Sequence, residues 1–104
     1  MRKFIIGWIT FKPEMRGPFL SAISAHVAAT RQEEGCVFFD VSLSLDGPNI
    51  AVVTECFESE EAHQSHLQTP HMNRFRAEMP RLLVNGRFEN VYSDRFSTDL
   101  VEFS

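Results

Sequence analysis

Three polar residues in the middle of the chain, Glu55, His66 and His71, are the main candidates for acid–base chemistry. The sequence predicts that His66 lies in the last turn of a short helix, where the negative end of the helix dipole favours imidazolium. His71 is the second residue of the next predicted helix, where the positive end favours neutral imidazole. Two histidines biased toward different protonation states are suited to act as acid and base, so we expect both to be catalytic together with Glu55. The plainer alternative is that His71 caps a helix and His66 lies at a wet boundary.

Glu55 lies in the middle of a predicted strand, where burying an unpaired carboxylate is costly. If residues 46–49 (Asp-Gly-Pro-Asn) form a hairpin turn, Glu55 lies directly opposite Asp40 on the same face of the sheet. Two carboxylates that close do not both ionise freely, so the pKa of one should rise unless a cation lies between them. The functional interpretation is a polar anchor that orients a histidine or a substrate hydroxyl. The structural alternative is a hydrogen bond or salt bridge to Arg74 or Arg76.

Apolar and aromatic side chains are expected to form the walls of a pocket around these groups. The residues expected to bind substrate are Trp8, Phe38, Asp40, Phe57, Met72, Phe75 and Tyr92. Stripes of aromatic residues and methionine at regular spacing are also typical of plain core, which is the alternative for most of them. The hydroxyl of Tyr92 could donate a hydrogen bond to a bound oxygen.

A metal site is not expected, although His63 and His66 form a His-x-x-His pair that can share one face of a helix. No cysteine or carboxylate is positioned in the sequence to complete a set of ligands with them. His26 is expected at the outer edge of the first helix. The sequence contains no glycine-rich phosphate loop and no nucleophile elbow.

The elements that must position these residues follow from hydrophobic spacing and from helix-start and turn signals. We predict, in order, a strand at 3–12, a helix at 17–32, strands at 36–45 and 50–58, a short helix after Ser59, a helix from Thr69-Pro70 through Leu82, and a strand at 87–96. The order β-α-β-β-α-β predicts one α+β domain, 1–104, with a ferredoxin-like fold: a four-stranded antiparallel sheet with helices on one face. With Leu45 opposite Ile50, Cys36 and Cys56 would be three positions out of line, about 10 Å, so both are expected to be free thiols.

Both faces of the predicted hairpin are apolar enough to need cover. Phe39 and Val41 lie on one face, and Phe38, Val53 and Phe57 lie on the other. Two helices can cover only one face of a sheet. A second copy of the same sheet is the simplest cover for the other face, so we expect a homodimer with the tail, 97–104, packing on the partner.

The bulk composition excludes several classes of protein. The chain has 104 residues, 43% of them hydrophobic, which is typical of one globular domain. The net charge of −4 is spread without a basic block, so no nucleic acid is expected as a partner. No stretch approaches the ~18 apolar residues of a membrane span, and no signal peptide is indicated. A cytoplasmic location is therefore expected.

Three segments of the chain have content and spacing that match a known family: EEGCVFFDVSL (33–43), ECFESEEAHQSHL (55–67) and TPHM (69–72). The sequence KPE at 12–14 fits the end of the first strand. Together they resemble the antibiotic biosynthesis monooxygenase family, which includes small quinol monooxygenases, over roughly residues 3–96. The resemblance specifies the fold better than the reaction, since this superfamily hosts several chemistries.

The resemblance implies a dimeric α+β barrel with a pocket in each subunit between the sheet and the helices. It places Glu55, Phe57, His66 and His71 on the pocket side. The haem-degrading branch of the family uses a particular asparagine, tryptophan and histidine. Here Ile6 and Phe57 take the places of the first two and no histidine occurs at 72–81, so haem chemistry is not implied.

The function that we expect from these residues is oxidation of a small phenolic, quinol or polyketide-like substrate by O2 without a cofactor. An electron-rich phenol reacts with oxygen once it is deprotonated, so the protein needs an apolar slot and a base. We expect His71 to be the base, assisted by His66 or Glu55.

Two other functions are compatible with the same sequence. An isomerase or epimerase would abstract a proton next to a carbonyl, and Arg74, Arg76 or Arg81 pointing into the pocket would favour it. A non-catalytic dimeric binding or stress protein would be favoured by a pocket closed by Phe57 and Phe75, with both candidate histidines facing solvent.

Overall fold

The secondary structure follows the expected order along the chain. The structure of the protein is a computed structural model, and it describes residues 1–95, 97 and 99–102. Its elements are β1 (Arg2–Phe11), the 3-10 helix η1 (Pro13–Met15), α1 (Arg16–Thr30), β2 (Cys36–Leu43), β3 (Ile50–Phe57), α2 (Glu60–Leu67), α3 (Pro70–Leu82) and β4 (Leu83–Ser93). The ferredoxin-like α+β fold is therefore confirmed, with the second helical segment divided into α2 and α3.

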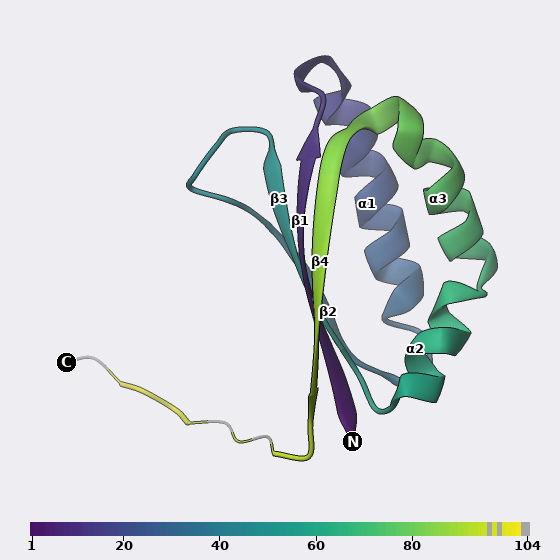
Figure 1. The fold of residues 1–104 in the computed structure, drawn as a ribbon. Helices are drawn as coiled ribbons and strands as arrows, with labels where there is room; N and C mark the ends of the chain where they lie inside the picture. The colour runs from purple at the N-terminus through teal and green to yellow at the C-terminus, as the bar shows by residue number, and fades with distance from the viewer. Residues whose placement is uncertain (96, 98, 103–104) are drawn as a thin grey trace.

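The four strands form one antiparallel sheet in the order β2-β3-β1-β4. The central strand β1 alternates strictly: the odd-numbered residues Lys3, Ile5, Gly7, Ile9 and Phe11 are buried, and the even-numbered residues are half-buried. Figure 1 shows all three α-helices on one side of the sheet and none on the other. The buried residues of β1 face the helices, and the half-buried ones lie on the open face.

The core lies between the sheet and the two longer helices. Phe11 of β1 stacks on Phe19 of α1 with ring centroids 4.6 Å apart, and Phe75 and Leu82 of α3 belong to the same buried cluster. Fully burying a side chain of this size contributes roughly 1.5–3 kcal/mol, so these contacts hold the helices at a fixed height above the sheet.

Both short-range helix-start predictions are confirmed. The Ser59 side chain accepts a hydrogen bond from the Ala62 backbone N–H at 3.0 Å, and the Thr69 side chain accepts one from Met72 at 3.2 Å. These caps fix where α2 and α3 begin, and hence where their histidines lie. No helix among the described residues is long and apolar enough to cross a membrane.

The register of the β2–β3 hairpin differs by one residue from the expected one. Glu55 pairs with Phe39, while Asp40 pairs with Thr54 on the opposite face. The loop is longer than a four-residue turn, because the Ser44 N–H bonds to the Ile50 carbonyl at 2.9 Å across residues 45–49. A one-residue slip turns every side chain of a strand to the other face, so the predicted Asp40–Glu55 pair is wrong.

The two cysteines are free, as expected, although the register that led to this prediction was not correct. Cys36 pairs with Phe57 and Cys56 pairs with Phe38, with a strand irregularity between them.

The last strand begins four residues earlier than expected, directly after α3. The Lys12 N–H donates to the Leu82 carbonyl at 2.9 Å, which joins the end of α3 to the end of β1 and leads the chain straight into β4. β4 then pairs along β1 as far as Ser93, so the predicted end at residue 96 lies outside the described residues.

Candidate functional site

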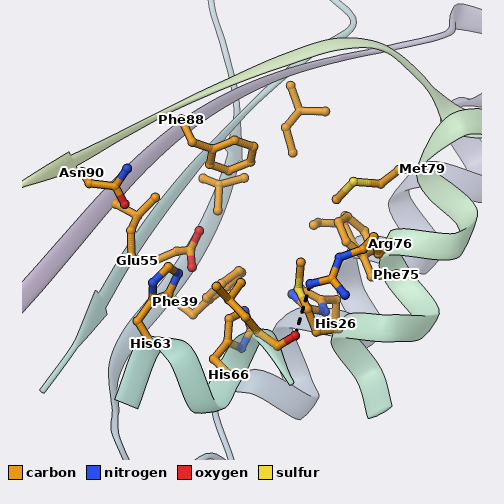
Figure 2. A pocket seen from close by; sticks show the side chains of 16 residues that line it. His26, Phe39, Glu55, His63, His66, Phe75, Arg76, Met79, Phe88 and Asn90 are labelled. Atoms are coloured by element: carbon orange, nitrogen blue, oxygen red, sulfur yellow. Dashed lines mark hydrogen bonds between the residues drawn. The ribbon is translucent and has the colours of Figure 1, made fainter. Parts of the chain in front are cut away.

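A cavity of about 370 Å³ lies between the helix side of the sheet and the three helices. Its walls are mostly apolar, with a few polar groups. It is lined by Ile5, Ile9, Ile23, His26, Phe39, Val53, Glu55, His63, His66, Leu67, Met72, Phe75, Arg76, Met79, Phe88 and Asn90. Figure 2 shows side chains from β3, β4, α2 and α3 converging on this space. A cavity of this size and character is typical of a small-molecule site.

The wall formed by β4 depends on a glycine in β1. Gly7 pairs with Phe88, and the aromatic ring of Phe88 lies where a β-carbon of residue 7 would be. The absence of a side chain at Gly7 thus lets Phe88 lie flat across the sheet and close that end of the cavity.

Within the described part of the chain, Glu55 is the one carboxylate in the cavity wall. It stands in a row across the sheet between Phe39 and Ile5, with Asn90 beyond, and its side chain is only 7% exposed. Among the residues that the structure describes, no hydrogen bond or ion pair reaches its carboxylate. The pKa of Glu55 is raised to about 7, mainly by burial and also by the negative charge of Glu33, while Lys3 opposes the shift. The expected alternative of a salt bridge to Arg74 or Arg76 is not seen.

The four histidines of the chain form one cluster, and three of them, His26, His63 and His66, line this cavity. The ring centroid of His66 lies 5.4 Å from that of His26, 6.1 Å from His63 and 5.9 Å from His71. His26 stacks on Phe75 at 4.6 Å and is buried, so its predicted place at the outer edge of the first helix is wrong. Burial lowers the pKa of His26 and of His63 to about 4, with neighbouring positive groups adding to the effect.

A glutamate outside the predicted set joins the two candidate catalytic histidines. One oxygen of Glu33, Oε2, lies 2.8 Å from Nδ1 of His66 and 2.6 Å from Nε2 of His71. The ring of His66 lines the cavity and is 2% exposed, so its bond to Glu33 leaves Nε2 as the nitrogen available to the cavity. His71 does not line the cavity. It borders a separate shallow cleft between α1 and α3.

The structure brings some of the expected wall residues together and separates the others. Met72 and Phe75 line the cavity as predicted. Phe57 is fully buried beneath it, with its ring 5.0 Å from His66 and 5.2 Å from His63.

Four predicted substrate-binding residues lie elsewhere. Trp8 and Phe38 lie on the open face, because their neighbours in β1 and β2 are the ones that face the helices. Asp40 is exposed and paired with Arg31 at 2.9 Å. The Tyr92 hydroxyl donates to Oε2 of Glu60 at 2.9 Å, outside the cavity wall. The prediction that these four line the pocket is therefore wrong for this cavity.

Comparison with known proteins gives the family. Residues 4–78 match the family described as "Antibiotic biosynthesis monooxygenase", which is more than half of the chain. This chain belongs to the antibiotic biosynthesis monooxygenase family. The resemblance seen in the sequence is thereby confirmed.

Named relatives of this monooxygenase-family chain come from several bacteria. It is 32% identical over 73 residues to "Putative monooxygenase Rv0793" of Mycobacterium tuberculosis, covering 70% of this chain and 71% of the relative. It is 34% identical over 76 residues to "Putative monooxygenase YcnE" of Bacillus subtilis, covering 73% and 80%. The solved structure of Rv0793 superposes with a TM-score of 0.87 at 24% identity, covering 94% of this chain and 100% of that one. The structure of a "putative antibiotic biosynthesis monooxygenase" from Deinococcus radiodurans superposes with a TM-score of 0.87 at 20% sequence identity. The match covers 95% of this chain and 99% of that one, which supports the fold.

Several site residues of this family member were not among the predicted catalytic and substrate-binding residues. They are His26, Glu33, His63, Arg76, Met79, Phe88 and Asn90. Phe88 and Asn90 alternate along a strand in the sequence, and knowing which face of β4 meets the helices would have identified them. Glu33 carried no local signal, because its partners lie 33 and 38 residues away.

The raised pKa of Glu55 predicts a pH-dependent stability for this monooxygenase-family domain. The ordinary pKa is 4.5 and the folded value is about 7, so the folded state binds more protons than the unfolded state between these pH values. The free energy of unfolding should therefore fall as pH rises from about 4.5 to 7. The free energy of unfolding of Glu55→Gln, taken relative to that of wild type, should increase by roughly 1–3 kcal/mol from pH 5 to pH 8, as measured by urea unfolding. The exposed Glu58→Gln is the control, and parallel curves for Glu55→Gln and wild type would contradict the prediction.

Proposed function

We propose that this chain is a monooxygenase that oxidises a small phenol or quinol with O2 and without a bound cofactor. One observation carries the proposal: an unpaired carboxylate, Glu55, is buried in an otherwise apolar cavity that a bicyclic aromatic could fill. A pKa of about 7 makes this carboxylate a base matched to neutral pH. Because burial disfavours the ionised form, proton transfer from a phenolic hydroxyl to Glu55 relieves a desolvation cost.

The reaction can be balanced with the substrate as the only reductant. Glu55 takes the phenolic proton, and the phenolate transfers an electron to O2. The resulting radicals combine through a new carbon–oxygen bond, and the peroxide anion takes the proton back from Glu55 to give a hydroperoxide. Glu55 then removes the hydrogen of the same ring carbon as a proton, and the electrons of that C–H bond form the carbonyl while the O–O bond breaks. The leaving hydroxide takes this proton from Glu55 and becomes water. For a naphthohydroquinone, the products are a hydroxynaphthoquinone and water.

His66 is proposed to position the substrate rather than to take the first proton. Its Nδ1 is held by Glu33, so its Nε2 can accept a hydrogen bond from a second hydroxyl of the ring. This assignment moves the base from His71, where the sequence pattern suggested it, to Glu55. His71 instead steadies Glu33 from outside the cavity.

A second candidate function is favoured by Arg76. Of the three arginines whose inward orientation would favour an isomerase, Arg76 lines the cavity. Figure 2 shows its guanidinium on α3, hydrogen-bonded to the backbone oxygen of Leu67 at 3.1 Å. No carboxylate pairs with it among the described residues, so it could hold an anionic group of a carbonyl substrate while Glu55 abstracts a proton. In contrast, the open cavity and the burial of His66 do not fit the closed pocket expected of a non-catalytic protein.

One experiment separates the two enzymatic functions. Chelator-treated protein should accelerate oxygen uptake with reduced naphthoquinones or anthrones above the protein-free rate, and the product should carry one atom from ¹⁸O2. In parallel, small α-hydroxy carbonyl compounds with an anionic group should be incubated in D2O and examined by NMR for exchange at the α-carbon. Exchange without oxygen uptake would favour the isomerase. Neither activity above background would contradict both proposals.

A further inference from the structure

The hydrogen-bonded set Glu33, His66 and His71 brings together three potential metal-ligand atoms, which proton chemistry in the cavity does not require. Its three side chains come from three different segments: the connection after α1, the last turn of α2 and the first turn of α3. Each offers one potential ligand atom, and the three atoms lie within 4.8 Å of one another. They are also sheltered, since the side chains are 16%, 3% and 16% exposed.

We propose that Glu33, His66 and His71 bind a divalent first-row transition-metal ion such as Zn²⁺, Co²⁺ or Ni²⁺. Two imidazoles and one carboxylate are a ligand set that these ions use, with further positions left open to water. The ion would take the place of the two ring protons that now bridge to Glu33. Ligand atoms around a tetrahedral Zn²⁺ lie about 3.3 Å apart. Binding therefore requires the carboxylate oxygen, now 2.8 and 2.6 Å from the two nitrogens, to move outward and the two imidazole rings to adjust around the ion.

The approach to this site is negatively charged. A surface cleft beside α2 is lined by Glu33, Glu34 and Glu58, together with Ser65 and Thr69. Two of these glutamates, Glu34 and Glu58, are exposed and would raise the local concentration of cations at the entrance. Glu33 belongs both to this cleft and to the histidine set, so the cleft leads directly to the ligand atoms.

The other two histidines do not share the site. His63 is on the same helix as His66, three residues earlier, but its ring packs on Phe57 and lines the cavity. His26 is buried on the cavity side as well. The metal ligands are therefore not the His-x-x-His pair that the sequence suggested, and His63 offers an internal control.

Metal binding would also change the cavity, a consequence that rests on the function proposed above. With Nδ1 of His66 donating to Glu33, its Nε2 is a hydrogen-bond acceptor. With Nδ1 bound to a metal, the ring proton resides on Nε2, which becomes a donor to the cavity. The ion would thus switch His66 from accepting a hydroxyl proton to donating to a phenolate oxygen.

The test measures binding without turnover. Full-length protein freed of metal with a chelator is titrated with Co²⁺, observed by its visible absorption, and with Zn²⁺ by calorimetry. We expect one ion per chain. Glu33→Gln should weaken the affinity by at least about 10–100-fold, and His71→Gln should do the same. Circular dichroism and thermal unfolding check that each variant is folded.

Two control variants, His63→Gln and Glu55→Gln, should bind the ion as wild type does. Glu55→Gln also separates this proposal from the catalytic one, because it should lose turnover and keep metal binding. Failure to saturate at one ion per chain, or equal affinity for wild type, Glu33→Gln and His71→Gln, would overturn the proposal and leave the catalytic role of Glu55 untouched.

Discussion

Replacing Glu55 with glutamine is expected to lower turnover by about 10²–10⁴-fold, the usual contribution of a positioned base. Glutamine has the same shape and can still accept a hydrogen bond, but it cannot hold a proton taken from the substrate. The apolar wall around it is unchanged, so the Kd for a product-like quinone should change much less than kcat. Oxygen uptake with a reduced naphthoquinone measures the first quantity, and fluorescence or calorimetric titration with the quinone measures the second.

The dependence of kcat/KM on pH should follow the ionisation of Glu55. Because burial raises its pKa to about 7, kcat/KM should rise with pH and level off above about pH 7. Glu58→Gln changes an exposed carboxylate three residues further along the chain and should leave the profile as in wild type. Full turnover in Glu55→Gln would show that another residue is the base, and His66 would then be the next residue to substitute.

Local signals in the sequence were sufficient for the order of elements. Ser59 and Thr69 begin their helices as predicted, because a side-chain cap depends only on the next three residues. The family resemblance then placed Glu55, Phe57, His66 and His71 on the pocket side. The structure has Glu55 and His66 in the cavity wall, while Phe57 is buried beneath it and His71 lies outside it.

The register of the hairpin could not be read in the same way. The sequence DGPN fits a tight turn, but the ladder closes at Ser44 and Ile50, and this single shift moves Asp40 and Phe38 to the open face. Alternation along β1 fixes which residues share a face, but not which face meets the helices. Trp8 was therefore assigned to the wrong side of the sheet.

Glu33 was beyond sequence reasoning for a different reason. It lies after α1 in a stretch of five consecutive residues of turn and bend character, residues 31–35, where no periodicity exists. Its role arises only when the end of α1 is packed beside the α2–α3 junction. Contacts of 33 and 38 residues in sequence separation are set by tertiary packing, so only the structure could join Glu33 to His66 and His71.

We propose, finally, that a second copy of the chain covers the open face of the sheet. Phe4, Ile6, Trp8 and Val52 lie half-buried on this face, and the helices are all on the other side, as Figure 1 shows. A four-stranded sheet that presents apolar side chains to water is an unfavourable surface unless it is paired. The guanidinium of Arg87 lies 4.5 Å from the centre of the Trp8 ring, which orders the ring on the surface before any partner binds.

Sedimentation equilibrium should therefore find a dimer at micromolar concentration. Trp8→Ala should raise the dimer Kd roughly 30–1,000-fold, since a central aromatic residue of an interface typically contributes 2–4 kcal/mol. Leu45→Ala is the control, because Leu45 is a fully exposed apolar residue of the β2–β3 loop and lies outside the strands that form this face. A monomeric wild-type protein would contradict the proposal. A monomer produced by Leu45→Ala, with Trp8→Ala still dimeric, would place the interface on the hairpin loop instead, and the open face would then need another explanation for its apolar side chains.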